Sequence, residues 1–313
     1  MTEVEAGAVH TGTSRSDRQE TEVTRTAAGR FTGEVVPPID SSTILVVRDA
    51  LGSTGTGERG ADAADAGVEV LLLERHLDSD FAGGALVFPG GKVAPEDREL
   101  APARWRGEPL EAWQERLGVT TDRDALGFLV AAVRETFEEV GVLLAVREDG
   151  RPVSADDLAS EAFVEARNRL ARRGEAWDWR PWLDEEGLVL DLGALALWSW
   201  WVTPEGQHRR FDTRFFLAAA PTGQVAEQDR VEATGVTWSR PEDALAAHER
   251  GEVTVIFPTR RNLETLARFG DVATAMRAAR AGEVDQRRIV PRIVEVAGRI
   301  MVQHPDEDEP SPI

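Results

Sequence analysis

The sequence contains no cysteine. This absence excludes a disulfide framework and every metal site that needs thiolate ligands. It leaves the redox compartment open and is compatible with the reducing cytosol. We therefore expect a cytoplasmic protein.

A long hydrophobic run is also missing. The most apolar stretch, residues 192–202, is much shorter than the roughly 20 residues that a membrane-spanning helix needs. Residues 1–30 carry Glu3, Glu5 and Glu20 and have no apolar centre, which is not typical of a signal or transit peptide. The last three residues do not form a peroxisomal Ser-Lys-Leu signal. The sequence therefore predicts no contact with a membrane.

Positively charged residues are fewer than negatively charged ones. The chain has 36 lysines and arginines against 56 aspartates and glutamates, a formal net charge of −20. Such a balance argues against a protein that holds nucleic acid by neutralising its phosphates. A small phosphorylated substrate stays compatible with it, provided that a divalent cation lies between the two negative partners.

Composition divides the 313 residues into three parts. Residues 1–40 are polar and without periodicity, which predicts a disordered segment. Residues 41–303 contain both strand-like and helix-like patterns with no internal repeat, which predicts a single α/β domain. Residues 304–313 are acidic, and we expect a disordered tail.

The central part shows several strand and helix patterns. Residues 43–50 and 68–76 indicate two strands of a hairpin. Residues 126–140, 154–173 and 260–281 indicate helices.

The region 197–220 is rich in tryptophan and indicates a strand, a loop and a second strand. Trp198 and Trp200 alternate, so we expect them on one strand face within the core. The intervening loop contains His208, Arg209 and Arg210, which could contact a phosphate, and Arg210 is the candidate substrate-binding residue. Asp212 and Arg214 are expected to form a structural ion pair. A terminal hairpin is expected further along the chain, turning at residues 297–298.

The helix at 126–140 places three carboxylates on one face. Because an α-helix turns by about 100° per residue, Glu135, Glu138 and Glu139 lie on neighbouring positions. Arg134 precedes Glu138 by four residues and can pair with it. A solvated amphipathic helix is the simplest interpretation. The mutual repulsion of three carboxylates also favours a hard divalent cation, for which oxygen ligands are suited.

A glycine turn lies upstream of this helix. Gly90 and Gly91 allow the backbone to approach a ligand closely, and Pro89 fixes the entry into the turn. Alone, this stretch indicates a surface turn. Asp97, however, follows Gly91 after five residues, and the arginine–glutamate helix follows later.

This combination resembles the Nudix box, usually G, five residues, E, seven residues, then R-E-U-x-E-E-x-G-U with U aliphatic. The matching residues are Gly91, Arg134, Glu135, Glu138, Glu139, Gly141 and Val142. Asp97 replaces the glutamate, Thr136 takes the first U position, and 36 residues separate Asp97 from Arg134. One branch of Nudix hydrolases, which includes the animal peroxisomal coenzyme A diphosphatases, has an insertion inside the box. The chain resembles this branch.

The resemblance implies a Nudix fold, in which a mixed β-sheet with insertions lies between α-helices. It implies Mg²⁺ or Mn²⁺ bound by Glu138 and Glu139, with Glu135 and the carbonyl of Gly90 or Gly91 as further ligands. Arg134 would orient a glutamate.

Two features of this comparison stay open. The proton acceptor in hydrolysis is either Glu135 or the later Glu232, and Glu232 is equally well explained as a solvated strand residue. Residues 98–125 form the insertion within the box, which we expect to be a packed excursion. A lid over the substrate is the alternative.

Residues 71–91 partly match a second motif, which often precedes the box in coenzyme A diphosphatases. The retained residues are Leu71, Leu72, Arg75, Gly84, Phe88, Pro89, Gly90 and Gly91, and the departures are at His76, Ser79 and Asp80. Arg75 is therefore a candidate for the 3′-phosphate, or else a solvated strand end, and Gly90 is a candidate substrate contact. The resemblance implies hydrolysis of coenzyme A or acyl-coenzyme A.

Alternative interpretations are a hydrolase of ADP-ribose, NAD(H) or a nucleotide sugar, and a non-catalytic nucleotide sensor. Each implies a small nucleoside diphosphate as partner, and a homodimer is compatible with the family.

Overall fold

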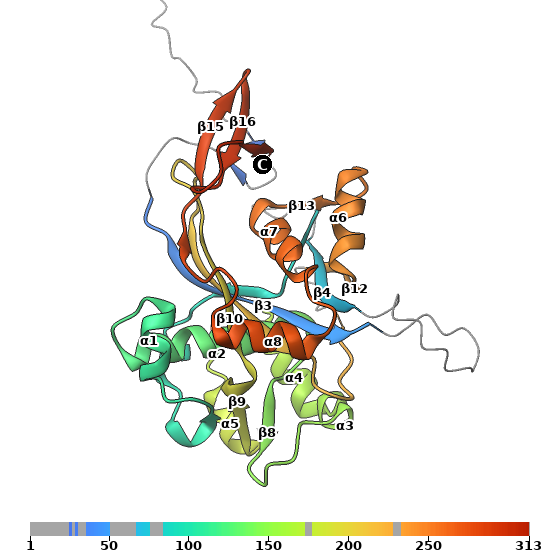
Figure 1. Cartoon of the computed structure of the whole chain (residues 1–313). Coiled ribbons are helices and arrows are strands. Elements are labelled where there is room, and N and C mark those ends of the chain that lie inside the picture. The colour runs from blue at the N-terminus through green and yellow to red at the C-terminus, as the bar shows by residue number, and fades with distance from the viewer. Residues whose placement is uncertain are drawn as a thin grey trace, which may run out of the picture.

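The computed structural model describes residues 25–26, 29–30, 36–50, 67–75, 84–172, 177–227 and 233–312. Its centre is a nine-stranded sheet in which β3 lies between antiparallel β4 and parallel β11 (Figure 1). The sheet follows the order β13–β5–β4–β3–β11–β10–β14, with β12 paired to β4 and β6 paired to β3. The predicted mixed sheet and the predicted hairpin of the first two strands are confirmed.

The strands of this sheet are β3 (Ile39–Asp49), β4 (Val68–Arg75), β5 (Ala85–Val87), β6 (Gly90–Lys92), β10 (Ala196–Val202), β11 (Phe211–Ala219), β12 (Ala233–Ser239), β13 (Thr254–Val255) and β14 (Arg288–Ile289). The α-helices are α1 (Glu111–Leu117), α2 (Asp122–Val140), α3 (Ala155–Ala159), α4 (Glu161–Leu170), α5 (Arg180–Glu185), α6 (Pro241–Glu249), α7 (Phe257–Leu266) and α8 (Val272–Ala281). Short 3₁₀ helices are η2 (Glu96–Glu99), η3 (Pro102–Arg104) and η4 (Leu192–Ala194).

The remaining strands of the described residues form three small sheets. They are β1–β2 (Arg25–Thr26 and Gly29–Arg30), β7–β9–β8 (Trp105–Arg106, Leu188–Asp191 and Ala145–Arg147) and β15–β16–β17 (Arg292–Val296, Arg299–Gln303 and Ser311–Pro312). The hairpin β15–β16 projects from the rest of the molecule (Figure 1). It turns at Ala297 and Gly298, both with positive φ, as expected from the sequence.

The two faces of the central sheet bury separate hydrophobic cores, because successive strand residues point to opposite sides. On β3, Ile44 belongs to the core that contains side chains of α1, α2, α4 and α5, whereas Leu45 belongs to the core that contains side chains of α6, α7 and α8. On β11, Phe216 and Phe215 divide in the same way. We call these faces the α2 face and the α7 face. The sheet therefore lies between helices, as the resemblance implied.

A β-bulge in β10 changes which side chains share a face. The pairing with β11 shifts between Leu197 and Ser199, so the strand has an extra residue at Trp198. Trp198 and Trp201 both belong to the α7-face core, whereas Trp200 lies against Arg214. The expectation that Trp198 and Trp200 share a face was therefore wrong.

Helix α2 has clear end signals. The side chain of Thr121 accepts a hydrogen bond from the backbone of Asp124, which caps the helix start. Gly141 ends the helix with φ of 70°, a left-handed conformation that glycine adopts without strain. Fourteen of its nineteen residues are buried, so the helix lies within the molecule and not on its surface.

The insertion at 98–125 packs on the α2 face. Leu100, Trp113 and Leu117 belong to that core. Arg214 donates from Nε and Nη2 to the carbonyl of Leu117, at 3.1 and 2.7 Å. Its guanidinium lies 4.1 Å from the ring centres of both Phe128 and Trp200. One buried arginine from the sheet thus fixes the end of the inserted helix α1, and its predicted ion pair with Asp212 is also present, at 2.6 Å.

Other expectations differ from the structure at particular residues. The helix expected at 154–173 is two helices, α3 and α4, which meet at Ser160, although Ser154 forms the expected cap. The helix expected at 260–281 is α7 and α8, because the chain leaves the helix before Asp271 caps the second one. Residues 304–312, expected to be disordered, include β17, which pairs with β16.

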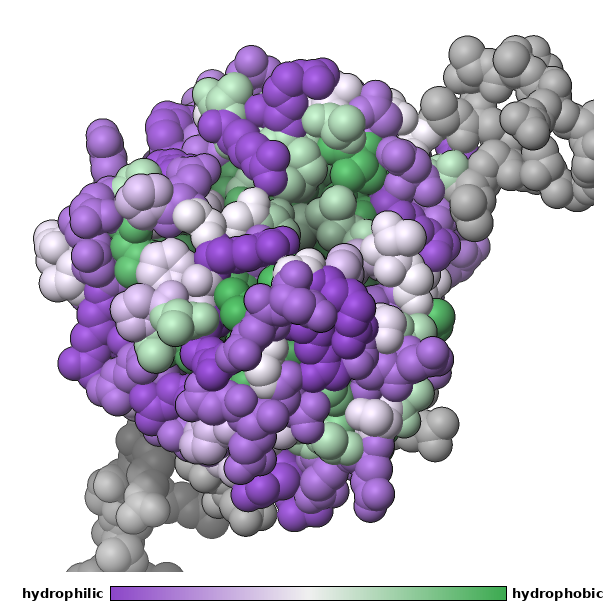
Figure 2. Space-filling view, turned by 90° about the horizontal axis from the view of Figure 1, so that it is seen from below, coloured by the Kyte–Doolittle hydropathy of each residue, from purple (hydrophilic) through white to green (hydrophobic). Residues whose placement is uncertain are grey.

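The surface shown in Figure 2 is mainly hydrophilic, with hydrophobic residues exposed in limited areas between charged ones. Within the described ranges, no helix combines the length and the apolar character that crossing a membrane requires.

The anchoring of the insertion can be tested with Arg214→Gln. This change removes the bonds to the Leu117 carbonyl and leaves buried polar groups without partners. We expect the free energy of unfolding to fall by about 3 kcal/mol, measured by urea denaturation at constant m-value. Arg106→Gln, which breaks the exposed pair with Asp191, is the control and should cost less than about 1 kcal/mol. Equal effects of the two changes would contradict the assigned role.

Candidate active site

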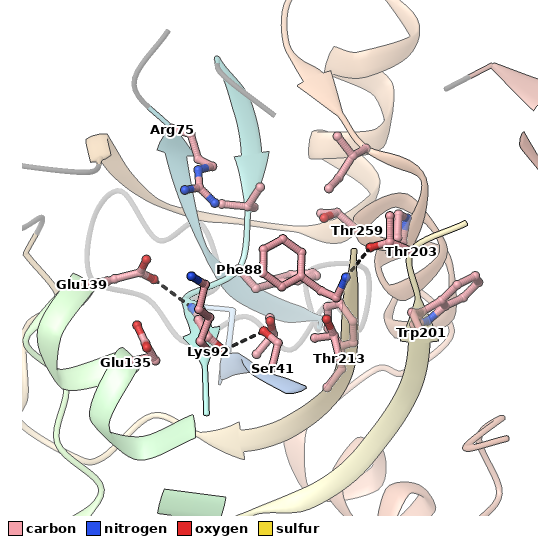
Figure 3. Close-up of a pocket in the computed structure, with 18 of the residues that line it drawn as sticks. Ser41, Arg75, Phe88, Lys92, Glu135, Glu139, Trp201, Thr203, Thr213 and Thr259 are labelled. Atoms are coloured by element: carbon pink, nitrogen blue, oxygen red, sulfur yellow. Dashed lines mark hydrogen bonds between the residues drawn. The ribbon is translucent and has the colours of Figure 1, made fainter. Parts of the chain in front are cut away.

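A cavity of about 420 Å³ opens on the α7 face of the central sheet. Its floor comes from the strands, where Thr43, Thr213 and Trp201 point to the same side. The lining residues are Ser41, Thr43, Arg75, Val87, Phe88, Gly90, Gly91, Lys92, Glu135, Glu138, Glu139, Trp201, Thr203, Arg209, Phe211, Thr213, Phe215, Ile256, Pro258 and Thr259. Figure 3 shows Glu135 and Glu139 on one side of this cavity and the side chains of β10 and α7 on the other.

The insertion contributes nothing to this cavity. All of residues 98–125 are described, and none of them lines it. The insertion packs on the opposite face of the sheet, against the core formed with α2. The arrangement supports the packed excursion and contradicts the lid.

The three carboxylates predicted to share a helix face line the cavity together. Their arrangement depends on Arg134, which is 9% exposed. Its Nη1 donates to Glu135 at 2.9 Å and lies 3.4 Å from Glu138. Its Nε and Nη2 form a two-pronged pair with Asp97, 2.9 Å on each prong. Arg134 therefore positions Glu135 and Glu138, and Asp97 in turn holds Arg134.

The charge of Arg134 is secured by its neighbours. Burial alone would lower its pKa, but the carboxylates of Glu135 and Asp97 outweigh burial and raise the pKa well above its usual value. Asp97 is fully buried, and its Oδ2 also accepts a bond from the backbone of Ala94. The pair joins the two ends of the interrupted box, so the 36 residues between them do not disturb its geometry.

The double glycine is required by close contacts. A Cβ at Gly90 would lie 2.5 Å from the Ser42 carbonyl oxygen, and one at Gly91 would lie 2.4 Å from the Glu135 carboxylate. The N–H of Gly90 donates to Glu139 Oε2 at 2.8 Å. The carbonyl of Gly91 accepts a bond from Ser41 Oγ at 2.6 Å. Both glycines therefore contact the carboxylates or the cavity, as predicted.

Basic side chains also line the cavity. Arg75 at the end of β4 is one of them, and its contact with the substrate stays a prediction. Lys92, the only lysine among the 313 residues, is another. It lies near Glu139 and Ser41 (Figure 3), and its carbonyl accepts a bond from Arg134 at 2.9 Å.

The prediction for Arg210 was wrong. Its side chain is 6% exposed and donates to the carbonyls of Thr203 and Val36, at 3.0 and 2.8 Å. The arginine that lines the cavity is the preceding one, Arg209, which is exposed. The run of basic residues therefore predicted the right loop. Because adjacent side chains point in different directions, it did not predict which of the two arginines lines the cavity.

Several lining residues gave no functional signal in the sequence. Ile256, Pro258 and Thr259 come from the start of α7, more than a hundred residues after the box. Trp201 reaches the cavity only because of the β10 bulge, and its Nε1 lies 3.1 Å from Ser199 Oγ. The candidate base Glu232 lies outside the described residues.

The oxygen-only donor set fits a hard divalent cation in chemical type. Three carboxylates and a glycine carbonyl border one cavity. Across the described residues, no three acidic or histidine side chains converge closely enough to hold an ion as they stand. Binding of a cation would therefore need small movements of these side chains. Burial restricts Glu138 the least, since its side chain is 18% exposed.

A helix with clustered carboxylates lies beside a strand that begins with two glycines, and the sheet of that strand lies between helices. This combination defines the class of Nudix hydrolases. In agreement, the structure is similar to a Nudix hydrolase from Alicyclobacillus acidocaldarius, with a TM-score of 0.60 and 28% identity, over 78% of this chain and 97% of that one. Residues 99–266 match the NUDT19 Nudix domain family, and because this is more than half of the chain, the chain belongs to that family.

Individual members of the family are also similar. The acyl-coenzyme A diphosphatase NUDT19 of Gallus gallus is 31% identical over 239 residues, which cover 65% of this chain and 62% of that protein. The corresponding Homo sapiens protein is 29% identical over 236 residues, covering 66% and 62%. The similarity thus spans less than two thirds of the length of these relatives.

The close contact at Gly91 can be tested with Gly91→Ala. The backbone there tolerates alanine, but the new methyl group must displace the Glu135 carboxylate. We expect hydrolase turnover to fall by about a hundredfold, the effect of a displacement near 1 Å. Gly270→Ala, where an added methyl group meets nothing within 4 Å, is the matched control. Full activity of Gly91→Ala would show that Glu135 need not occupy its observed place.

Proposed function

We propose that the chain hydrolyses the diphosphate bond of a nucleoside-diphosphate-linked substrate, in particular coenzyme A or acyl-coenzyme A. The products would be 3′,5′-ADP and phosphopantetheine or its acylated form. The observation that carries this proposal is the meeting of Glu135, Glu138 and Glu139 with Gly90 and Gly91 at one cavity. The names of the relatives support the substrate class. The cysteine-free composition is compatible with a cytoplasmic enzyme.

The cation in this proposal is Mg²⁺ or Mn²⁺, held by Glu138, Glu139, Glu135 and the carbonyl of Gly91. When bound, such an ion neutralises phosphate oxygens and lowers the pKa of a water molecule. The chemistry of the donor set supports this choice.

The residues of the chain have distinct parts in the proposed reaction. Glu135 or Glu232 accepts the proton of the attacking water, whose oxygen bonds to phosphorus while the bridging oxygen leaves. Arg134 keeps Glu135 in place and stays charged. Lys92 adds a positive charge beside the carboxylates, where the diphosphate would otherwise meet only negative groups.

The alternative of a non-catalytic nucleotide sensor is less well supported. A sensor does not need the full set of carboxylates, whereas here all three line the cavity. A buried arginine positions two of them, Glu135 and Glu138, and the Gly90 N–H holds the third, Glu139. ADP-ribose, NAD(H) and nucleotide sugars stay as alternative substrates within the same chemistry.

The role of the carboxylates is tested by Glu138→Gln and Glu139→Gln. Glutamine keeps the shape, and at residue 139 it still accepts the bond from Gly90, so the fold should survive. We expect each variant to lose about a thousandfold in turnover with Mg²⁺ or Mn²⁺. Circular dichroism and the unfolding midpoint serve as controls for folding. Near-full turnover of either variant would refute the proposed metal site.

The substrate is tested by digesting coenzyme A with the purified protein and separating the products by HPLC. We expect 3′,5′-ADP in the presence of Mg²⁺ or Mn²⁺ and none with chelator. A parallel panel of ADP-ribose, NADH and a nucleotide sugar gives the comparison. Hydrolysis of a panel member but not of coenzyme A would retain the chemistry and reject the substrate.

A further inference from the structure

Two of the cations that line the cavity, Lys92 and Arg209, have no carboxylate partner among the described residues. Among the described residues, neither Lys92 nor Arg209 forms an ion pair, although the chain has 56 acidic residues. The nearby Arg134 and Arg210 are instead fully engaged, one with carboxylates and the other with backbone carbonyls. The charges of Lys92 and Arg209 are therefore available to an anionic ligand.

These cations belong to different ends of the cavity. Lys92 ends β6, directly after Gly91, and pairs in register with Ser41 beside the carboxylates. Arg209 lies just before β11, in the turn closed by the bond from the Phe211 N–H to Thr203 Oγ1, at 3.0 Å. Thr203 lies across the cavity from Glu135 and Glu139 (Figure 3). Lys92 thus accompanies the carboxylates, and the turn that carries Arg209 lies beside Thr203 on the opposite side.

The walls between the two cations are not anionic. They combine aromatic rings with hydroxyl groups, contributed by Phe88, Trp201, Phe211, Phe215, Thr203, Thr213 and Thr259. Flat apolar surfaces with a few hydroxyl groups suit a nucleoside, whose base is planar and whose ribose carries hydroxyls. The cavity volume of about 420 Å³ is within the range of small-molecule sites.

We propose that Arg209 is a specificity-determining residue that binds a second phosphate of the substrate, separate from the diphosphate at the Lys92 end. The ligand class is a nucleoside 5′-diphosphate derivative that carries a further phosphate on its ribose. This inference rests on the proposed function and deepens it, because the extra phosphate separates coenzyme A from ADP-ribose, NAD and nucleotide sugars. A guanidinium suits this contact, since it offers two parallel N–H donors to phosphate oxygens.

The kinetic test compares coenzyme A with 3′-dephospho-coenzyme A, which differ only in the ribose phosphate. For the unaltered protein, kcat/KM should favour coenzyme A by about tenfold or more, the effect of one charge-assisted contact. In Arg209→Gln the ratio of the two kcat/KM values should fall to about one, mainly through KM for coenzyme A. Arg209→Lys should retain part of the preference.

Two further variants separate specificity from general loss. Lys92→Gln should lower kcat/KM for both substrates and leave their ratio unchanged, because both contain the diphosphate. Arg292→Gln removes an exposed arginine on the separate β15–β16–β17 sheet and should change neither value. A ratio that is the same in the unaltered protein and in Arg209→Gln would overturn the inference.

A binding measurement keeps this test independent of catalysis. Titration calorimetry with adenosine 3′,5′-bisphosphate and with 5′-AMP should show tighter binding of the bisphosphate, and Arg209→Gln should remove the difference. If this holds without any hydrolysis of coenzyme A, the proposed function fails and the inference stands. If coenzyme A is hydrolysed but Arg209→Gln leaves the binding difference intact, the inference fails and the proposed function stands.

Discussion

The geometry of the site depends on one buried guanidinium. Arg134 contacts Asp97 before the long insertion, Glu135 and Glu138 on its own helix, and the carbonyl of Lys92 on the glycine strand. Burying a charge is costly unless its partners are fixed, and here Asp97 is itself fully buried and bonded to the backbone. This mutual dependence explains how an interrupted motif keeps its shape. The chain between Asp97 and Arg134 can lengthen freely as long as both ends return to the same ion pair.

The sheet separates structural from chemical roles. Its α2 face receives the insertion, which Arg214 fastens through the Leu117 carbonyl. Its α7 face carries the cavity. Of the described helices on the α2 face, only α2 reaches this cavity, through its carboxylates beside the short strand β6. Residues added on the first face therefore add buried contacts without narrowing the cavity. The division follows from strand alternation, since neighbours such as Phe215 and Phe216 serve different cores.

The sequence predicted those features that depend on regular periodicity or on direct steric need. The shared face of Glu135, Glu138 and Glu139 follows from the helical repeat, and the glycines follow from contacts that admit no side chain. The sequence did not predict features set by irregular backbone or distant packing. A single extra residue in β10 moved Trp201 into the cavity and Trp200 out of it. The turn before β11 has no regular repeat from which the direction of its side chains could be predicted. Arg210 was therefore predicted to contact the substrate, whereas Arg209 lines the cavity.

Because the chain has an overall negative charge, the positively charged side chains of the cavity matter for binding an anionic substrate. A chain with a formal charge of −20 repels a multiply charged anion at long range, so local arrangement must overcome the general field. Several of the described surface arginines already have carboxylate partners, for example Arg104 with Asp184 and Arg250 with Glu252. A cation without a carboxylate partner is different, since it loses no existing pair when an anion arrives. If Arg209 binds a second phosphate as proposed, cations at two ends of one cavity would restrict the substrate more closely than the carboxylates do, because any diphosphate satisfies the carboxylate end alone.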